Sequence, residues 1–453
     1  MPYVQNAAAL TAHGDVELRR IALGIIEHAL AATDSYPLAK QQLEFDGRIL
    51  RIGGEPLEMN GAARVHFLGA GKASFGIARA VEEALGDALS SGLVICKHGQ
   101  QGTLERIKVR LASHPVPDEA GMQAADEALT LARAVRPGDI LICGFTGGSS
   151  SLMPLPVAGL TLEDKQKMTR LLLSCGANIV EINAVRKHLS RIKGGQLAAA
   201  TPADVTLINL TVSDVIGNAL DYITDPGVAD SSTLADARAT LDKYALWDKA
   251  PPAVASYLKE GGRAFETPKD LAPRRVRNIV LTDGMCLCTA AAEKARSDGF
   301  QPLILSTALE GESREIGGVF AAVAREVLAS GHPLKPPCAI IGGGETVVNL
   351  DSWRAEGGPN QEFALSAALL LDGAARAVVV GLDSDGTDGP TDYAGGMVDD
   401  QSAACARTIG LNLSELLRSH QSTEALVGLG DVILTGATGT NVNDLKLLLV
   451  AGP

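Results

Sequence analysis

The sequence predicts an α/β protein of two domains, each a β-sheet covered by helices on both faces. At 453 residues the chain is longer than one hydrophobic core usually organises. Short β-branched runs alternate with helical stretches, the pattern of βαβ units around a parallel sheet. The alternation stops at residues 245–275, which are rich in proline and charge, and then starts again. We therefore expect a domain boundary in this stretch.

The elements can be assigned in order along the chain. An amphipathic helix is expected at residues 15–36, strands at 64–69, 92–97, 139–145 and 205–212, and helices at 74–86 and 119–135. After the break, strands are expected at residues 278–284, 301–307, 338–348, 377–386 and 431–436. Ligands of open α/β sheets bind at the carboxyl ends of the strands, so the loops that follow these strands are the expected functional sites.

Composition excludes several classes of function. The formal net charge of −13 disfavours a binder of nucleic acid or of an anionic membrane. The chain has neither a leader-like N-terminus nor an apolar run of the ~18 residues that a membrane-spanning helix needs. Its seven scattered cysteines are typical of a reduced intracellular protein. We expect a cytoplasmic protein that binds small molecules, and the sequence leaves a homodimer open.

The stretch "GAGKAS" follows the first strand of the alternating series. Gly69 and Gly71 would let the backbone approach a ligand closely, and the start of the next helix offers N–H groups to an anion. Lys72 adds a positive charge there. The loop is not a Walker A motif, because Ala73 stands where that motif requires a hydroxyl.

Two further loops of the first domain carry groups that suit an anion. The stretch "TGGSSSLMPLP" combines Gly147 and Gly148 with the hydroxyl of Ser150, which fits either a phosphate or carboxylate site or a helix N-cap. Arg186 and Lys193 are seven residues apart and would share a face if their helix continued. They could then present two cations to one anion, although a run of charge is more commonly a solvated helix face.

Acidic residues follow strands in both domains. Asp214 leaves the strand at 205–212, where it could cap a helix or act as a general base. Residues 384–400, "SDGTDGPTDYAGGMVDD", crowd aspartates onto the loop after a buried strand. Like charges repel unless they are neutralised, and a divalent cation shared with substrate phosphates would do so. The alternative is a solvated turn held by hydrogen bonds from its own side chains.

Eight ordered stretches carry a family resemblance. They are "GAGKAS", "HPVPDEAG", "CGANIVEINAVRKHLSRIKGGQLA", "SDVIGN", "GGGETVV", "NQEFAL", "DGTDGPTD" and "TGATGTNVNDL". With them the chain resembles the class II glycerate 2-kinases, the family whose C-terminal part is called the MOFRL domain and whose members were often labelled hydroxypyruvate reductases. The resemblance runs from about residue 15 to the C-terminus.

The resemblance implies a fold and an activity. The fold would be two three-layer α/β/α domains, a Rossmann-like kinase domain with a mainly parallel sheet at residues 1–262 and a smaller mixed-sheet MOFRL-type domain at 263–453, with the active site in the cleft between them. The enzyme would transfer the γ-phosphate of ATP, with Mg²⁺, to the 2-hydroxyl of D-glycerate and give 2-phosphoglycerate.

The resemblance also assigns roles to residues. Lys72 would stabilise the transferring phosphoryl group, and Asp214 would orient or deprotonate the acceptor hydroxyl. The remaining assignments are Ser150, Arg186 and Lys193 for the substrate, Gly69, Gly71, Gly147, Gly148, Gly343, Asn360 and Thr387 for the nucleotide, and Asp385, Asp388 and Glu345 for the metal.

The sequence departs from the family pattern at the loops expected to hold the substrate. Pro359 stands where the family has an arginine, Asn218 replaces an acidic residue, and the loop at residues 222–228 is altered. Loss of a guanidinium from an anion site weakens binding unless the ligand has changed as well. The departures therefore suggest a kinase of a different hydroxy acid or sugar acid as an alternative.

Two other functions remain to be weighed. In an NAD(P)H-dependent hydroxypyruvate reductase, the first turn should follow the GxGxxG pattern, but Ser74 occupies the position of its third glycine and the next strand ends in Lys97 rather than in an acid. A binding protein that has lost the chemistry is a third possibility, and the retention of Lys72 and Asp214 argues against it.

Overall fold

A computed structural model describes residues 2–59, 63–100, 102–215, 220, 226–350, 356–373 and 376–452. The chain forms two compact units. The Rossmann-like unit comprises Ser35–Leu281, and the mixed-sheet unit comprises Met1–Asp34 together with Thr282–Pro453. The structure thus divides the chain at positions that differ from the expected boundary at residues 262 and 263.

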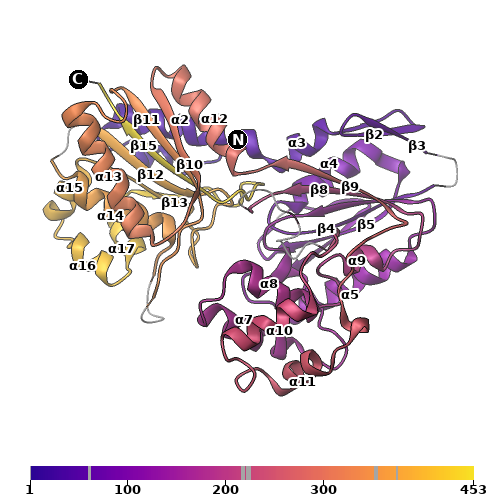
Figure 1. Ribbon diagram of the computed structural model, residues 1–453. Helices are drawn as coiled ribbons and strands as arrows, with labels where there is room; N and C mark the ends of the chain where they lie inside the picture. The colour runs from indigo at the N-terminus through magenta and orange to yellow at the C-terminus, as the bar shows by residue number, and fades with distance from the viewer. Residues whose placement is uncertain are drawn as a thin grey trace. The chain divides into compact units, whose positions relative to one another are not determined.

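A six-stranded sheet organises the Rossmann-like unit (Figure 1), with the strand order β6-β5-β4-β7-β8-β9. The pairs β4–β5, β5–β6, β4–β7 and β7–β8 are parallel. This is the strand order of a doubly wound Rossmann sheet, because the chain moves outward from β4 in one direction and from β7 in the other. The strands are β4 (Val65–Ala70), β5 (Leu89–Lys97), β6 (Ile107–Ala112), β7 (Ile140–Phe145), β8 (Thr206–Val212) and β9 (Arg275–Thr282).

Helices cover both faces of this sheet because successive strand residues point to opposite sides. In β4, Phe67 packs in the core shared with α4 (Ser74–Leu85), and the next residue, Leu68, packs in the core shared with α5 (Glu119–Ala134). The remaining elements around the sheet are α3 (Ser35–Gln41), α6 (Ser149–Leu152), α9 (Gln196–Ala199), η1 (Gly86–Ala88), and the antiparallel strands β1 (Leu43–Phe45), β2 (Ile49–Ile52) and β3 (Glu55–Glu58).

Four further helices of this unit pack around a core of their own. They are α7 (Leu162–Ser174), α8 (Ile179–His188), α10 (Leu234–Lys243) and α11 (Pro252–Glu260), and η2 (Arg263–Phe265) follows them. Met168, Val185 and Leu241 are among the buried residues that join the helices. Capping boxes at Thr161 and Asn178 fix the first turns of α7 and α8. These helices carry several cationic side chains of the candidate site.

The strand predicted to begin the second domain belongs to the first sheet. Residues 275–282 form β9, which lies beside β8 at the edge of the Rossmann-like sheet. The backbone N–H of Arg275 donates to the carbonyl oxygen of Val205, 3.1 Å away. The expected boundary was placed before this strand because the proline-rich stretch looks like a linker, whereas that stretch includes α11 and lies inside the first unit.

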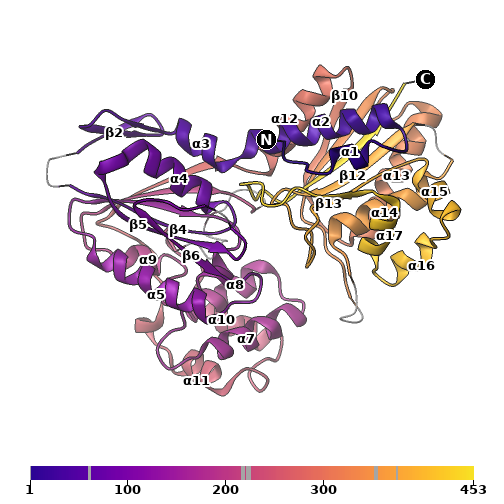
Figure 2. The same cartoon turned by 180° about the vertical axis from the view of Figure 1, so that it is seen from behind.

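The mixed-sheet unit has the strand order β10-β11-β15-β12-β13-β14. β10 and β11 are parallel, and the other neighbouring pairs are antiparallel. The helices α13 (Ser313–Ser330) and α14 (Pro359–Leu371) lie on one face in Figure 1, and α2 (Val16–Thr33) and α12 (Gly284–Ser297) lie on the other in Figure 2. The strands are β10 (Gln301–Leu309), β11 (Cys338–Gly344), β12 (Ala377–Asp383), β13 (Gly395–Asp399), β14 (Val432–Ile433) and β15 (Asp444–Val450), and α1 (Ala7–Leu10), α15 (Ser402–Thr408), α16 (Leu413–Arg418) and α17 (Ser422–Leu429) complete the unit.

The N-terminal helix belongs to this second unit, not to the first domain as expected. The fully buried guanidinium of Arg19 in α2 forms ion pairs with Asp399 at 2.5 Å and with Asp431 at 2.7 Å. Its NH2 group also lies 3.4 Å from the hydroxyl of Ser402. Sequence order alone could not show this, because the partners are about four hundred residues away.

The predicted fold class is confirmed: both units are three-layer α/β/α structures, one with a largely parallel sheet and one with a mixed sheet. The seven cysteines are present as thiols. In the part of the chain that the structure describes, no helix is both long and apolar enough to cross a membrane.

Candidate active site

The loop that carries Lys72 lies where the strand order of the Rossmann-like sheet reverses. β4 and β7 are neighbours, and the chain continues from them toward opposite edges of the sheet. Ligands of doubly wound sheets bind at this point, beyond the carboxyl ends of the strands. The loops after β4 and β7 are two of the stretches that the sequence marked for an anion, so the structure brings these two predicted loops together.

Backbone hydrogen bonds hold the two loops against each other. The N–H of Lys72 donates to the carbonyl oxygen of Gly147 at 2.9 Å, and the N–H of Ala73 donates to the hydroxyl of Thr146 at 3.2 Å. Gly71 has a φ of 135°, and a Cβ atom there would lie 2.2 Å from the Thr146 hydroxyl oxygen. Only glycine fits this close approach.

A histidine that the sequence did not single out stands beside Lys72. A Cβ atom at Gly148, where φ is 86°, would lie 3.2 Å from both Cγ of Lys72 and Cδ2 of His114. The signal that could have identified His114 is its place at the head of the "HPVPDEAG" stretch. Gly69, by contrast, lies inside β4, where a Cβ atom would meet the carbonyl oxygen of Gly144 at 2.9 Å, so its place is explained by packing.

Two of the predicted substrate ligands, Arg186 and Lys193, converge on the third, Ser150. A guanidinium nitrogen of Arg186 lies 2.5 Å from the Ser150 hydroxyl oxygen. The ammonium of Lys193 donates to the same oxygen and to the Ser150 carbonyl, each at 2.7 Å. One hydroxyl oxygen therefore accepts hydrogen bonds from both cations.

The route to this convergence differs from the expectation that one helix continues through both residues. Helix α8 ends at His188, so Lys193 lies beyond it. Ser190 forms a bridge with Pro156, and the N–H of Arg191 donates to the carbonyl oxygen of Leu155 at 3.0 Å. The chain is therefore in an extended pairing where the helix was expected, and the turn that follows returns Lys193 toward α6.

Lys165 of α7 is a third cation at this position, and sequence inspection missed it. With Ser150, Arg186 and Lys193 it lines a cavity of about 50 Å³ whose walls include Pro154 and Met168. Burial lowers the pKa of Lys165 to about 7, with a further contribution from Arg186. Burial likewise lowers the pKa of Arg186 to about 10, and burial together with the two neighbouring cations lowers that of Lys193 well below its usual range.

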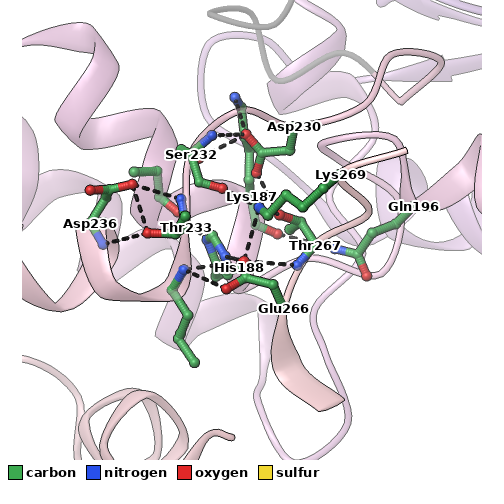
Figure 3. A network of polar contacts seen from close by, with 12 residues as sticks. Lys187, His188, Gln196, Asp230, Ser232, Thr233, Asp236, Glu266, Thr267 and Lys269 are labelled. Atoms are coloured by element: carbon green, nitrogen blue, oxygen red, sulfur yellow. Dashed lines mark hydrogen bonds and ion pairs between the residues drawn. The ribbon is translucent and has the colours of Figure 1, made fainter. Parts of the chain in front are cut away.

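Two other residues of α8 contact acidic side chains and hold the helix in place (Figure 3). The ammonium of Lys187 forms an ion pair with Asp230 at 2.8 Å, and Nε2 of His188 lies 2.8 Å from the carboxylate of Glu266. Successive helix residues point about 100° apart, so these two side chains leave the face from which Arg186 projects. We therefore assign Lys187 and His188 to structural roles.

Asp214 reaches the same edge of the sheet. It follows β8 by two residues, and β8 is the parallel neighbour of β7. Adjacent strands are about 4.8 Å apart, so the ends of β4, β7 and β8 line one short edge. The side chain of Asp214 is half-buried. Lys72, Ser150 and Asp214 thus follow three neighbouring strands.

The predicted nucleotide and metal residues of the mixed-sheet unit also share one sheet edge. Glu345 follows β11 and Asp385 follows β12, and Gly344 and Asp383 both pair with Asp444 at the start of β15. Because β15 runs antiparallel between the two strands, its first residue lies at their carboxyl ends.

Local contacts divide these residues into two groups. Asp385 accepts hydrogen bonds from the N–H and the hydroxyl of Thr387 at 2.8 and 2.7 Å, and Glu345 is exposed. Gly343, by contrast, lies within β11, where a Cβ atom would meet the sulfur of Cys288 at 2.8 Å. Gly343 is therefore explained by packing, and Asp385, Thr387 and Glu345 stay predictions.

The assignment of Asp388 as a metal ligand needs correction. Each of its two carboxylate oxygens accepts two hydrogen bonds, from the backbone N–H and the side-chain amide of Asn360 and of Gln361, at 2.8 to 3.1 Å. These residues form the first turn of α14, so Asp388 caps that helix. Burial raises the pKa of Asp388 to about 6 despite these bonds. The lone pairs that a metal would need are already in use.

Asn360 likewise takes part in a network of hydrogen bonds between buried side chains. Its amide donates to Asp444 at 2.8 Å, and its carbonyl oxygen accepts from the ammonium of Lys446. Lys446 also forms an ion pair with Asp444 at 3.1 Å. Neither Asp444 nor Lys446 was singled out from the sequence, since an acid and a base separated by one residue at a strand start carry no distinctive pattern.

The glycines beside Lys72 and the acidic side chains after β11 and β12 are the candidate groups for a nucleotide phosphate and for Mg²⁺. At Gly71 and Gly148 the absence of a Cβ atom lets the two loops pack closely beside Lys72. Within the described residues, no group of three His, Cys, Asp or Glu side chains is arranged to hold a metal. Mg²⁺ that is shared with phosphates needs only one or two carboxylates, for which Asp385 and Glu345 are the candidates.

The structure explains one of the positions at which the sequence departs from the family pattern. Pro359 is the first residue of α14, a position that suits proline because its missing N–H would have no partner inside the helix. No guanidinium can project from this position. Asn218 and residues 222–225 lie outside the described part of the chain.

Comparisons with known proteins show the family and the fold of the chain. A family model described as a domain of unknown function, DUF4147, matches residues 21–259, and the MOFRL family model matches residues 338–444. A glycerate 2-kinase of Pyrococcus horikoshii is 38% identical over 438 residues, covering 96% of this chain and 98% of that protein. A putative hydroxypyruvate reductase of Agrobacterium vitis is 37% identical over 451 residues, covering 99% of this chain and 98% of that protein.

A solved structure shows the same fold. The glycerate kinase of Thermotoga maritima superposes with a TM-score of 0.81 at 36% identity, over 96% of this chain and all of that one. The first family model alone spans more than half of the chain. The chain therefore belongs to the class II glycerate kinase family of phosphotransferases that act on an alcohol group.

Proposed function

We propose that the protein phosphorylates D-glycerate at its 2-hydroxyl with ATP and Mg²⁺ and releases 2-phosphoglycerate and ADP. One observation carries this proposal. The Lys72 turn lies at the switch point of the sheet. The cavity lined by Lys165, Arg186 and Lys193 is also lined by Ser150, two residues after Gly148, where a Cβ atom would lie 3.2 Å from Cγ of Lys72. The relatives named glycerate 2-kinase and glycerate kinase support the choice of acceptor.

The acceptor would be held by its carboxylate at the cationic cavity. A carboxylate matches the fork of a guanidinium, and Arg186 and Lys193 both point at one oxygen position, the hydroxyl of Ser150. Asp214 follows β8, which is separated by β7 from β4, the strand before Lys72. It would accept the proton of the 2-hydroxyl as the hydroxyl oxygen forms the new bond to phosphorus.

Lys72 would stabilise the negative charge on the transferring phosphoryl group. The bond between the γ-phosphorus and the bridging oxygen breaks, and ADP leaves with that oxygen. Mg²⁺ would neutralise phosphate charge when bound, with Asp385 and Glu345 as its candidate ligands. Gly147, Gly148 and Thr387 remain candidates for contact with the nucleotide. The expectation that the two domains share the active site stays a prediction.

Pro359 favours a second candidate, the phosphorylation of a different small hydroxy acid or sugar acid. The family arginine at this position would add a guanidinium to an anion site, and proline cannot replace its hydrogen bonds. A longer acid could form hydrogen bonds with other side chains. Reduction of hydroxypyruvate is disfavoured because Ser74, fully buried at the start of α4 and 3.2 Å from the Thr146 hydroxyl, occupies the third position of the glycine pattern.

The test is ADP release from Mg·ATP with D-glycerate, beside a panel of four- to six-carbon sugar acids, with the product identified by phosphorus NMR. Turnover of D-glycerate with phosphate on the 2-oxygen supports the proposal. Turnover of a longer acid alone would move the assignment to the second candidate. No ADP release with any hydroxy acid, or nicotinamide oxidation that depends on hydroxypyruvate, would overturn the kinase assignment.

A further inference from the structure

The three cations of the small cavity have only neutral partners. Lys165 donates to the carbonyl oxygen of Leu189 at 3.1 Å, Arg186 donates to the Asn183 amide oxygen and the Ser150 hydroxyl, and Lys193 donates to Ser150. Each hydrogen bond of these side chains within the described residues is thus accepted by an uncharged oxygen. Buried cations are ordinarily paired with carboxylates, so the cluster is built to receive an anion.

A lysine on the same helix as Arg186 shows the contrast. Lys187 is buried as well, but Asp230 neutralises it at 2.8 Å. Among the described residues, a buried lysine with a structural role thus has a carboxylate partner, whereas Lys165, Arg186 and Lys193 have none at the cavity.

We propose that Lys165, together with Arg186 and Lys193, forms a subsite that binds the carboxylate of the acceptor acid, and that Lys165 takes up a proton as the acid binds. This inference rests on the proposed function for the identity of the acid. It adds Lys165 as a residue in direct contact with the substrate, on a helix, α7, that none of the sequence motifs covers.

Size and surroundings favour a carboxylate over a larger group. The cavity has a volume of about 50 Å³, which admits a small anionic group but not a sugar or a base. Its walls combine the three cations with Pro115, Pro117 and Leu189, so water is largely excluded and charge interactions are strong. The Ser150 hydroxyl oxygen accepts from both Arg186 and Lys193 and shows where their donors converge, so a carboxylate would bind beside it.

Proton uptake follows from the charges around Lys165. Burial and Arg186 lower its pKa to about 7. Lys193 also lines the cavity, and burial together with Arg186 and Lys165 lowers its pKa as well. A bound carboxylate favours the charged form and raises the pKa again. Above about pH 7 the acid must therefore bind together with a proton, so affinity for the acid should fall as the pH rises, with no matching loss of affinity for the nucleotide.

The experiment compares the wild type with Lys165→Met and with a control, Lys167→Met. Lys167 lies on the same helix, is exposed and forms an ion pair with Glu163 at 2.6 Å. Titration calorimetry measures the binding of D-glycerate, of glycerol and of Mg·ATP at pH 6 and pH 8. Two buffers of different ionisation enthalpy are compared to give the number of protons taken up, and both are amines so that no buffer anion competes with the acid. KM values for acid and nucleotide are measured in parallel.

We expect the wild type and Lys167→Met to take up a proton with D-glycerate at pH 8 and less at pH 6, and to bind glycerol at least tenfold more weakly. Lys165→Met should bind D-glycerate about 10- to 100-fold more weakly and take up less proton, with an unchanged KM for the nucleotide. Unchanged affinity for the acid would overturn the subsite. Weaker binding of Mg·ATP instead would assign the cavity to a nucleotide phosphate and equally overturn it.

The binding measurements do not depend on whether the protein turns over D-glycerate. If D-glycerate binds with the expected dependence on Lys165 but is not phosphorylated, the subsite stands and the proposed reaction fails. If Lys165→Met is poorly folded, Lys193→Met provides the same comparison, and equal affinity of the wild type for D-glycerate and glycerol overturns the subsite in either background.

Discussion

Replacement of Arg19 by methionine should strongly destabilise the mixed-sheet unit. The guanidinium is fully buried and lies 2.5 Å from Asp399 and 2.7 Å from Asp431, whose side chains are also buried. The variant would leave two carboxylates in the core with only neutral groups and the partly exposed His13 as partners. Removing one member of a buried ion pair costs about 3–5 kcal/mol, and we expect a loss of about 4 kcal/mol in the free energy of unfolding.

The pH dependence of this loss can be derived as well. Burial alone would raise the pKa of Asp399, but its hydrogen bond and ion pair with Arg19 outweigh this and lower it. A carboxylate with a lowered pKa in the folded state contributes stability above its unfolded pKa of about 3.9 and loses it as the pH falls. The difference between the wild type and Arg19→Met should therefore be full at neutral pH and shrink below about pH 4.

The assay is urea unfolding followed by circular dichroism, with amide hydrogen exchange of residues 16–33 as a local probe of α2. Arg376→Met is the matched control, because Arg376 also pairs with N-terminal residues, Asp15 and Glu17, but is about half exposed. Exposed pairs contribute about 0–1 kcal/mol. If Arg19→Met unfolds at the same urea concentration as the control, the argument that this ion pair anchors α2 is wrong.

Three further predictions concern the candidate site. Lys165→Met should stabilise the ligand-free protein by roughly 4 kcal/mol near neutral pH, because a lysine pKa of about 7 in the fold, against about 10.4 in the unfolded chain, disfavours folding by about 1.4 kcal/mol per pKa unit. The same shift makes wild-type stability rise from pH 7 to 10, and thermal melts across this range should show the slope in the wild type and not in the variant. Asp388→Asn should cost about 1–3 kcal/mol in urea unfolding, since an amide turns N–H groups toward the donors of Asn360 or Gln361. Gly71→Ala should cost at least about 2 kcal/mol, because its Cβ atom would overlap the Thr146 hydroxyl at a φ of 135°, and equal melting temperatures would contradict this.

Local patterns were sufficient to predict most of the Rossmann-like sheet. β4, β7 and β8 are short runs of buried apolar residues, and each ends where glycine or a polar residue begins the next loop. That composition determines both the strand and its exit, so the loops that carry Lys72, Ser150 and Asp214 could be located from the sequence.

Long-range contacts could not be predicted in the same way. The helix α2 has the pattern of any amphipathic helix, and long-range contacts such as the ion pair of Arg19 with Asp399 show which unit it belongs to. Likewise β9 follows a proline-rich stretch that resembles a linker, and β15, the central strand of the second sheet, was absent from the predicted strands.

The same limit applies to the site. The aspartates of residues 384–400 suggested a metal because their neutralising partners are distant in sequence: Asp388 is satisfied by the first turn of α14, and Asp399 by Arg19. Lys165 was missed because a single lysine on a polar helix carries no signal, and its importance arises only from the cations that the fold places beside it.

The central claim is that the Lys72 turn transfers phosphate to D-glycerate. The most direct measurement is the rate of ADP release from Mg·ATP with D-glycerate for the wild type and Lys72→Met, after thermal melts have shown that both are folded. We expect turnover by the wild type and a loss of about 100-fold or more in kcat for the variant. Equal rates for the two proteins would contradict it.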